Sequence, residues 1–302
     1  MSADPALVEL LHLLRLQDYR HTAVTPKTHE TVVSRSLERR PSLADILGWN
    51  RPFEEADLDP QLYALLERAE ALETDHDGKL RTNIRVASLG TDLFVHSAFP
   101  TNEKDAVFFG PDTYRFVRFL EAQISQLEKA GLTVDMGTGS GAGGIAVARK
   151  PGGPRTILVD INAKALRYAQ INAAAAGVEA ELLESIRVPQ CDLLVGNAPY
   201  LMDAGGRTYR DGGDLLGGAV SLDWIEQGLR QLSPGGTILL YTGAAYVDGR
   251  SPLLMAIEDA CSAAGARLEV QELDPDVFGE QLLEPGYEDV ERIAAVGLTI
   301  RV

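Results

Sequence analysis

Apolar residues at helical spacing dominate the first part of the chain. One helical face is formed by four leucines: Leu7, Leu10, Leu11 and Leu14. Three further helices are predicted over Lys27–Arg39, Ser42–Leu47 and Pro60–Leu72. The sequence DHDG at residues 75–78 is a turn signal. Residues 1–78 are therefore predicted to form a small, all-helical domain.

Short apolar runs separated by turn signals follow from residue 80 onward. The stretch Leu80–Phe99 has two such runs around Gly90 and predicts a β-hairpin, so residues 79–105 are expected to link two domains. Farther on, strand-like and helix-like segments alternate. The predicted strands are Thr133–Met136, Thr156–Val159, Ala180–Leu183, Asp192–Val195, Thr237–Thr242, Arg267–Asp274 and Arg292–Ile300. The predicted helices are Thr113–Ala130, Gly143–Lys150, Asn162–Ala176, Ser221–Leu232 and Ser251–Ala264.

This alternation predicts an α/β fold, in which helices cover both faces of a mostly parallel, seven-stranded sheet. The last two strands are joined by residues 275–289, which contain no helix long enough for a parallel crossover. A terminal antiparallel hairpin is therefore expected. Residues 106–302 are expected to form this second, catalytic domain.

The charge balance narrows the choice of partners. The chain has 44 Asp and Glu against 28 Lys and Arg, a formal net charge of −16, which disfavours a nucleic-acid partner. One basic cluster in the helical part is either a solvated face or a partner-binding patch: Lys27, Arg35, Arg39 and Arg40. Two Cys exclude a disulfide framework, and the five His show no ligand spacing, so no metal is expected.

The N-terminus lacks the features of a targeting segment. Its first residues include Asp4, Glu9 and Asp18 and no basic run. No apolar run approaches the roughly 18 residues that a membrane span needs. A cytoplasmic protein with no membrane partner is expected.

Glycines follow the first strand of the catalytic domain. Residues 132–146 read LTVDMGTGSGAGGIA, so that Asp135 ends an apolar strand and Gly137, Gly139 and Gly141 precede a helix. Glycine tolerates positive φ and lets a ligand approach the backbone, and a helix N-terminus offers unpaired N–H groups. A nucleoside or nucleotide site is predicted, with Thr138 part of the same loop.

Several ligands compete for this loop. A phosphate-binding P-loop would end in Lys-Ser/Thr, whereas Gly144-Ile145 stands here. A dinucleotide fits the literal G-x-G-x-x-G spacing, and a turn without a ligand is a further alternative. S-adenosylmethionine differs in charge, because a carboxylate at Asp135 would repel a pyrophosphate but attract an ammonium and a sulfonium.

Two further acids follow the next strands. Asp160, with Ile161 after it, closes the second strand, where a carboxylate can accept both ribose hydroxyls of either nucleoside ligand. Glu184 follows the third strand, and either faces an adenine amino group or is a solvated turn acid.

The fourth strand runs into a distinctive tetrapeptide. Residues 191–200 read CDLLVGNAPY. Asn197-Ala198-Pro199-Tyr200 resembles the Asn-Pro-Pro-Tyr motif of S-adenosylmethionine-dependent methyltransferases that modify planar nitrogens. These include the adenine amino methyltransferases of DNA and the glutamine-amide methyltransferases of peptide release factors, the HemK/PrmC family.

The resemblance implies a mechanism. The lone pair of an amide nitrogen is delocalised, and two carbonyls that accept its N–H groups favour its release toward a methyl group. The Asn197 side chain and the Ala198 backbone would supply them, and Tyr200 would lie against the flat acceptor. Ala198 replaces the first Pro of the motif, so Asn197 loses the restriction that a following Pro imposes, while Pro199 still biases Ala198 to an extended conformation.

The resemblance to the release-factor family covers about residues 80–302. Residues 108–114, FFGPDTY, resemble its Pro-Arg-Pro-Glu-Thr-Glu stretch, with Gly110 in place of the Arg and Asp112 in place of the first Glu. Residues 216–223, LGGAVSLD, resemble its Gly-Gly-x-x-Gly-Leu-Asp stretch. A Rossmann-like domain with S-adenosylmethionine as cofactor is implied. The residues expected to bind it are Pro111, Thr113, Asp135, Gly137, Thr138, Gly139, Gly141, Asp160, Ile161, Glu184 and Asn197.

We therefore predict an N-methyltransferase whose acceptor is an amide or guanidino nitrogen of a protein or small molecule. The helical domain would recognise that acceptor. The alternatives are a nucleic-acid amino methyltransferase and a non-catalytic S-adenosylmethionine-binding module; an NAD-dependent oxidoreductase lacks a Tyr-Lys pair. The loop 203–218, which includes Arg207, Tyr209, Arg210, Asp211 and Asp214, is either a lid over the substrate or a disordered surface loop.

Overall fold

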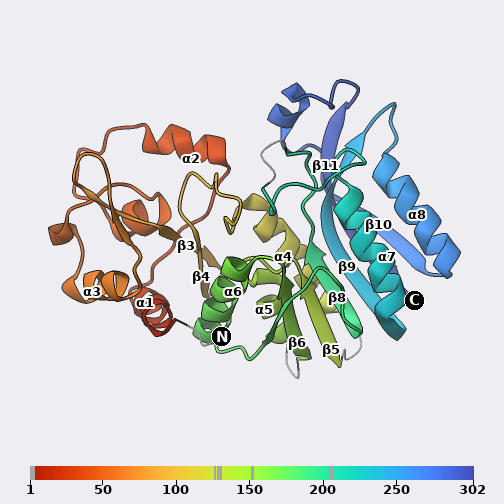
Figure 1. Cartoon of the computed structure of the whole chain (residues 1–302), viewed down its shortest axis with the longest axis horizontal. Helices are drawn as coiled ribbons and strands as arrows, with labels where there is room; N and C mark the ends of the chain where they lie inside the picture. The colour runs from red at the N-terminus through yellow and green to blue at the C-terminus, as the bar shows by residue number, and fades with distance from the viewer. Residues whose placement is uncertain (1–3, 126, 128–130, 151–152, 204–206) are drawn as a thin grey trace.

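A seven-stranded sheet forms the centre of the C-terminal part of the molecule (Figure 1). The computed structural model describes residues 4–125, 127, 131–150, 153–203 and 207–302. The strand order is β10-β11-β9-β8-β5-β6-β7. The bounds are β5 (Leu132–Met136), β6 (Arg155–Asp160), β7 (Glu181–Glu184), β8 (Cys191–Asn197), β9 (Leu232–Tyr246), β10 (Arg267–Asp274) and β11 (Arg292–Arg301). Strands β5 to β9 are parallel and β11 is antiparallel to both neighbours, which confirms the predicted fold and terminal hairpin.

Successive residues of the central strands pack on opposite faces of the sheet. Leu193 and Val195 of β8 join the core beneath α4 and α5, whereas Leu194 joins the core beneath α7 and α8. The helix bounds are α4 (Pro111–Ile124), α5 (Ala142–Ala148), α6 (Ala163–Ala176), α7 (Ala219–Gln231) and α8 (Pro252–Ala264). Helix α4 begins earlier than expected because proline suits the first helical turn, and it ends at Ile124, earlier than the expected Ala130. Ser125 and Leu127 are not helical, and residues 128–130 lie outside the described residues.

The N-terminal part lies to one side of the sheet (Figure 1). Its elements are α1 (Pro5–Leu16), α2 (Pro26–Val33), η1 (Ala44–Gly48), η2 (Glu55–Asp57), α3 (Pro60–Arg68), β1 (Leu72–Thr74), β2 (Leu80–Thr82), β3 (Ile84–Leu89) and β4 (Asp92–Ser97). Strands β3 and β4 form the hairpin expected around Gly90. No helix of the described residues has the length and apolar character to cross a bilayer.

Residues 1–78 are not all-helical as expected, because Leu72–Thr74 form strand β1 after five helical segments. The helices also differ in extent. The helix expected at Lys27–Arg39 ends at Val33, because the Arg51 guanidinium takes up the carbonyls of Val32, Val33 and Arg35. These bonds give the last carbonyls partners outside a helical ladder.

Two other segments also differ from the prediction. The helix expected at Ser42–Leu47 is the π-helix η1 (Ala44–Gly48), which begins two residues later and ends one residue later than expected. The helix expected at Pro60–Leu72 ends at Arg68, because Glu70 adopts a left-handed φ of 53° and Leu72 opens β1. Strand β1 pairs with β2 in a hairpin around the DHDG turn, so Leu80 belongs to this hairpin. The division at 1–78, 79–105 and 106–302 stays a prediction.

Helix α6 joins the N-terminal part to the sheet. Apolar residues of α6 share one core with α1, α3 and the β3–β4 hairpin. The Asn172 amide bonds both the N–H and the carbonyl of Val95 in β4, at 2.8 and 3.1 Å. Asp92 lies between Arg149 at 2.7 Å and Arg15 at 3.4 Å. These contacts hold the hairpin against α6 and the end of α5.

Candidate functional site

A cavity of about 410 Å³ lies at the carboxyl ends of β5, β6 and β8. The chain runs from β5 outward to β6 and β7 and then crosses back to β8 on the other side of β5, and open α/β sheets bind ligands where the strand order reverses in this way. Nine residues singled out from the sequence line the cavity: Thr113, Asp135, Gly137, Thr138, Gly139, Asp160, Ile161, Asn197 and Pro199. Five others do not: Pro111, Gly141, Glu184, Ala198 and Tyr200.

Asp135 is a buried carboxylate at the end of β5. Its Oδ2 accepts hydrogen bonds from Thr138 Oγ1 at 2.6 Å and from the Gly144 N–H at 2.8 Å. Burial raises the pKa of Asp135 to about 6, against the opposing effect of these two bonds. Both bonds end on one oxygen, so Oδ1 keeps its capacity to accept from a ligand.

Asp160 connects the glycine-rich loop to the end of β6. One carboxylate oxygen accepts from the Gly139 N–H at 2.9 Å and the other from the Asn162 N–H at 2.9 Å. Burial raises the pKa of this carboxyl. Each oxygen retains a second lone pair, which is the requirement for accepting two neighbouring hydroxyls.

The three loop glycines meet three different needs. Gly137 has φ +64°, and a Cβ there would lie 2.3 Å from the Trp224 ring. Gly139 has φ +54° and lines the cavity, and a Cβ there would meet only the Gly137 carbonyl, at 3.9 Å, so this is where a ligand can approach the backbone. Gly141, at φ +84°, packs against Ala169 and not against the cavity. Close approach by a ligand therefore explains only one of the three.

The tetrapeptide after β8 divides between the cavity and the core. Asn197 and Pro199 line the cavity, and the Ala198 N–H donates to the Tyr241 carbonyl at 3.2 Å. Tyr200 is only 7% exposed, and its ring meets Tyr241 edge to face. Tyr200 does not line the cavity, because its ring fills the space left by Gly243, where a Cβ would lie 2.1 Å from it. Its placement against the acceptor stays a prediction.

Two other expected residues lie beside the cavity. Pro111 occupies the first turn of α4, where the Gly110 N–H donates to Thr113 Oγ1 at 3.3 Å. Glu184 is exposed at the end of β7, while the next two residues, Ser185 and Ile186, line the cavity. The turn is thus correctly located, but the contacting side chains are its neighbours.

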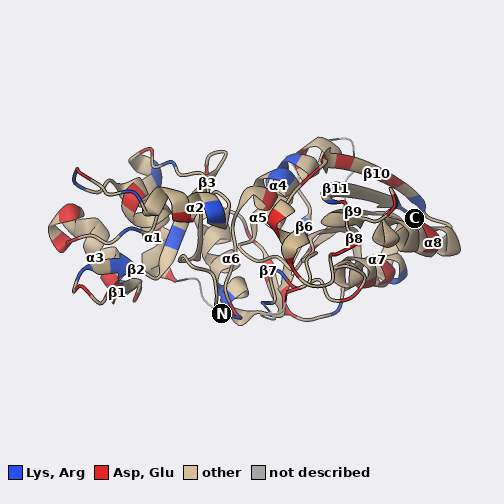
Figure 2. Ribbon diagram, turned by 90° about the horizontal axis from the view of Figure 1, so that it is seen from above, with Lys and Arg blue, Asp and Glu red and all other residues tan. Residues whose placement is uncertain are grey.

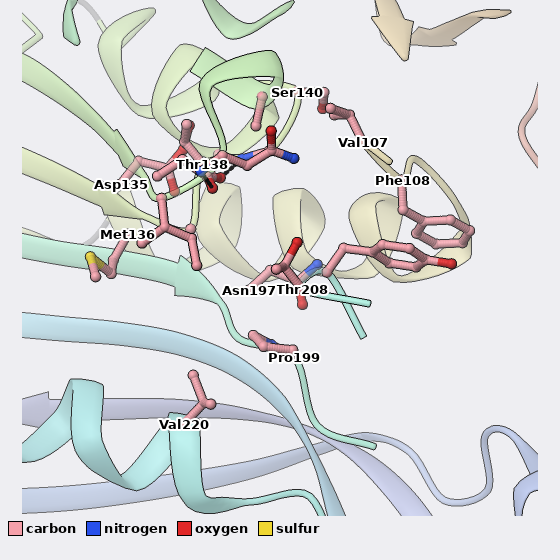
Figure 3. Close-up of a pocket in the computed structure, with 18 of the residues that line it drawn as sticks. Val107, Phe108, Asp135, Met136, Thr138, Ser140, Asn197, Pro199, Thr208 and Val220 are labelled. Carbon is pink, nitrogen blue, oxygen red and sulfur yellow. Dashed lines mark hydrogen bonds between the residues drawn. The ribbon is translucent and has the colours of Figure 1, made fainter. Parts of the chain in front are cut away.

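The lining of the cavity is acidic. Four carboxylates line it, Asp135, Asp160, Asp211 and Asp223, and the described lining residues include no Lys, Arg or His. Figure 3 shows Asp135 and Thr138 on one side of the cavity and Phe108 on the other, with Asn197 and Thr208 between them. Such a lining attracts a cation and opposes a pyrophosphate.

Comparisons with known proteins agree with this chemistry. The methyltransferase small domain family matches residues 114–243. A release factor glutamine methyltransferase from Enterococcus faecalis is 30% identical over 233 residues, which cover 72% of this chain and 80% of the relative. The chain belongs to the release factor glutamine methyltransferase family. A second relative of that name, from Deinococcus radiodurans, is 27% identical over 291 residues, covering 89% of this chain and 96% of the relative.

The solved structures agree on the fold. Trm5b from Pyrococcus abyssi matches with a TM-score of 0.50 and 14% identity, covering 80% of this chain and 68% of that one. As a release factor glutamine methyltransferase family member, the protein is an S-adenosylmethionine-dependent methyltransferase, and the dinucleotide interpretation is set aside. The acidic lining fits the positive charges of that cofactor.

The absent family arginine has a structural replacement. A Cβ at Gly110 would lie 2.4 Å from the Phe108 ring, so this ring occupies the space where an arginine side chain would begin. The Phe108 ring also stacks on the Tyr209 ring, with 5.4 Å between the ring centroids and 10° between the ring planes. Both rings line the cavity. Tyr209 also donates to the Thr101 carbonyl at 3.0 Å, which ties this part of the loop to the segment that follows β4.

Sequence reasoning missed some lining residues. One of them is Ile186, which is 67% exposed; Ile161, which the sequence did single out, is 49% exposed, and both line the cavity. Exposed isoleucines on two neighbouring turns suit the faces of a purine. Ile186 had one signal, an apolar residue among polar ones directly after a strand. Trp224 lines the cavity too, although its distance in sequence from the motifs concealed this.

In the loop 203–218, residues 204–206 lie outside the described residues, and the role of this loop as a lid stays a prediction.

Proposed function

We propose that this protein methylates the side-chain amide nitrogen of a glutamine in a peptide release factor. The names of its relatives support this acceptor. The observation that carries the proposal is the place of Asn197 and Pro199, which line the same cavity as the carboxylates of β5 and β6.

The cofactor is held by residues of the turns after β5, β6 and β7 and of the first turn of α4. Asp135 and Thr113 bind the amino-acid end, where a carboxylate complements the ammonium. Asp160 accepts from the ribose hydroxyls with its two remaining lone pairs, and the Gly139 backbone permits close approach. Ile161 and Ile186 cover the purine. The positively charged sulfur of S-adenosylmethionine supplies an electrophilic methyl carbon at this site.

The acceptor amide is activated by positioning. The Asn197 side-chain carbonyl and the Ala198 backbone carbonyl accept hydrogen bonds from the two N–H groups of the acceptor amide. These bonds favour release of the nitrogen lone pair toward the methyl group. Ala198 is fixed for this role by its N–H bond to the Tyr241 carbonyl, a bond that a proline could not make. Since neither residue has to ionise, orientation and fixed dipoles supply most of the rate enhancement.

The partner is a protein that reaches the cavity beside the N-terminal part. Acidic and basic residues are interspersed over both parts of the molecule (Figure 2). Three of the four basic residues in the predicted cluster form ion pairs: Arg39 with Asp45, Arg40 with Asp57, and Lys27 with Glu30. The pairing and the net charge of −16 support a protein partner over a nucleic acid.

The test is methyl transfer from labelled S-adenosylmethionine to a purified release factor, with the label located by peptide mass spectrometry. We expect label on one glutamine and none on a release factor in which that glutamine is alanine. RNA and DNA are offered in parallel reactions. Label that appears only in nucleic acid, or in neither, overturns the proposed acceptor.

A further inference from the structure

The connection between β10 and β11 contacts the loop that follows β8. Tyr287 and Gln281 in this connection are 1% and 3% exposed. The Tyr287 hydroxyl accepts from the Met202 N–H at 2.9 Å, and Gln281 Nε2 donates to the Met202 carbonyl at 3.2 Å. Both backbone groups of one residue, three positions after Pro199, are therefore bonded to side chains from about eighty residues farther along the chain.

The same connection also contacts the second part of this loop, residues 207–212. Gln281 Oε1 accepts from the Arg210 guanidinium at 2.6 Å. The Arg210 carbonyl accepts from the Leu201 N–H at 3.2 Å, and the Leu201 carbonyl accepts from the Gly212 N–H at 2.7 Å. These bonds join residues 199–202 to residues 208–212, and both segments carry residues that line the cavity: Pro199, Thr208, Tyr209 and Asp211.

Apolar packing supports the polar contacts. The Phe278 ring meets the Tyr200 ring edge to face at 5.8 Å, and the Arg210 guanidinium lies 5.8 Å from the centre of the Phe278 ring. A Cβ at Gly286 would lie 2.7 Å from Met202 Cε, so this glycine makes room for the methionine side chain. The β10–β11 connection thus packs against Tyr200, Met202 and Arg210.

We propose that Tyr287 is a positioning residue for methyl transfer. Through Met202 it fixes the backbone of the Asn197–Tyr200 loop, and so the direction of the carbonyls that accept the acceptor amide. The role of those carbonyls rests on the proposed function. Ala198 lacks the fixed φ of the motif's first proline, and the Tyr287 hydroxyl restrains the same loop from outside it.

The test compares two substitutions of the same chemistry. Tyr287→Phe removes one hydroxyl and keeps the ring. Tyr246→Phe is the matched control, because Tyr246 is half-buried under Arg292 and its hydroxyl bonds no residue of the described ranges. We expect Tyr287→Phe to lower kcat about tenfold or more, while the Kd for S-adenosylmethionine changes by less than about twofold. The control retains wild-type values.

Hydrogen exchange supplies a readout that needs no acceptor. Peptides that contain Met202 should exchange faster in Tyr287→Phe than in the wild type or the control. Wild-type exchange there, a wild-type kcat, or a Kd weakened in proportion to kcat overturns the proposal. If the wild-type protein does not methylate a release factor, the proposed function fails, and the exchange result still decides whether Tyr287 holds the loop.

Discussion

At the scale of single residues, the carboxylates of the cavity differ in what they have left to offer. One oxygen of Asp135 accepts both hydrogen bonds, from Thr138 and Gly144, and the other accepts none of them. In Asp160, each oxygen accepts one hydrogen bond from a backbone N–H and keeps a second lone pair. Asp135 is therefore suited to one strong contact with a cation, and Asp160 to two hydroxyls. The sequence identified both acids, but their hydrogen bonds depend on how the loop closes.

Cofactor affinity should depend on pH through Asp135. Its pKa of about 6 means that the carboxylate is charged above this pH and neutral below it. Binding of a cation favours the charged form, so affinity is full at pH 8 and falls as the pH drops from 7 to 5. Calorimetric titration with S-adenosylhomocysteine, which keeps the ammonium, should show a decline similar to that of S-adenosylmethionine. Asp135→Asn should bind weakly at every pH, and a flat wild-type profile contradicts the assignment.

Asn197 should be needed for transfer more than for binding. Asn197→Ala removes one acceptor carbonyl, so methyl transfer should be abolished, while S-adenosylmethionine binding stays within about tenfold, or about 1.4 kcal/mol. Single-turnover transfer and calorimetry measure the two effects. Full activity in this variant would rule out the acceptor role of Asn197.

At the scale of elements, the turn from β5 to α5 is set by packing as much as by its ligand. Gly137 must adopt a positive φ and also leave room for the Trp224 ring of α7. A turn that closes against α7 brings the loop, Trp224 and the end of β8 around one cavity. The glycine pattern in the sequence predicted the turn and its ligand class, but not that a tryptophan packs on it.

A pair of glycine substitutions separates strain from overlap. Gly78 has φ +78° and no atom within 4 Å of a Cβ, so Gly78→Ala should cost only the backbone strain, about 1–2 kcal/mol. Gly137→Ala has the same strain plus the overlap with Trp224, which should add about 1–3 kcal/mol and weaken cofactor binding. Urea denaturation gives both values. Equal losses would show that Trp224 moves aside freely.

At the scale of the whole molecule, polar groups are buried where the N-terminal part meets the β3–β4 hairpin. Arg85 donates to the Ser97 carbonyl at 3.0 Å and lies 3.4 Å from His29 Nδ1, while His29 stacks on Phe99. Burial, and next the charge of Arg85, lower the pKa of His21 and His29 to about 4. The same causes lower the pKa of His96, which is fully buried. These histidines are neutral in the folded protein.

Stability should consequently fall in acid. The folded pKa values lie below the unfolded value of about 6.5, so their contribution is complete above pH 6.5 and is lost as the pH falls toward 4. The thermal midpoint should drop between pH 7 and pH 5. His96→Leu, which removes one of the titrating groups, should drop less over the same range. An equal drop in the variant would exclude His96 from the effect.

Local pattern determined much of this protein. The alternation of strands and helices, the glycine-rich turn after Asp135 and the tetrapeptide after β8 each depend on residues close in sequence, and they gave the sheet, the cofactor and nine of the cavity residues. Contacts between distant segments decided the rest. Tyr200 enters the core because Gly243 leaves space for it, and Met202 is bonded by Tyr287 from the far end of the chain. Pairings of this kind depend on how the elements pack, and no spacing along the chain encodes them.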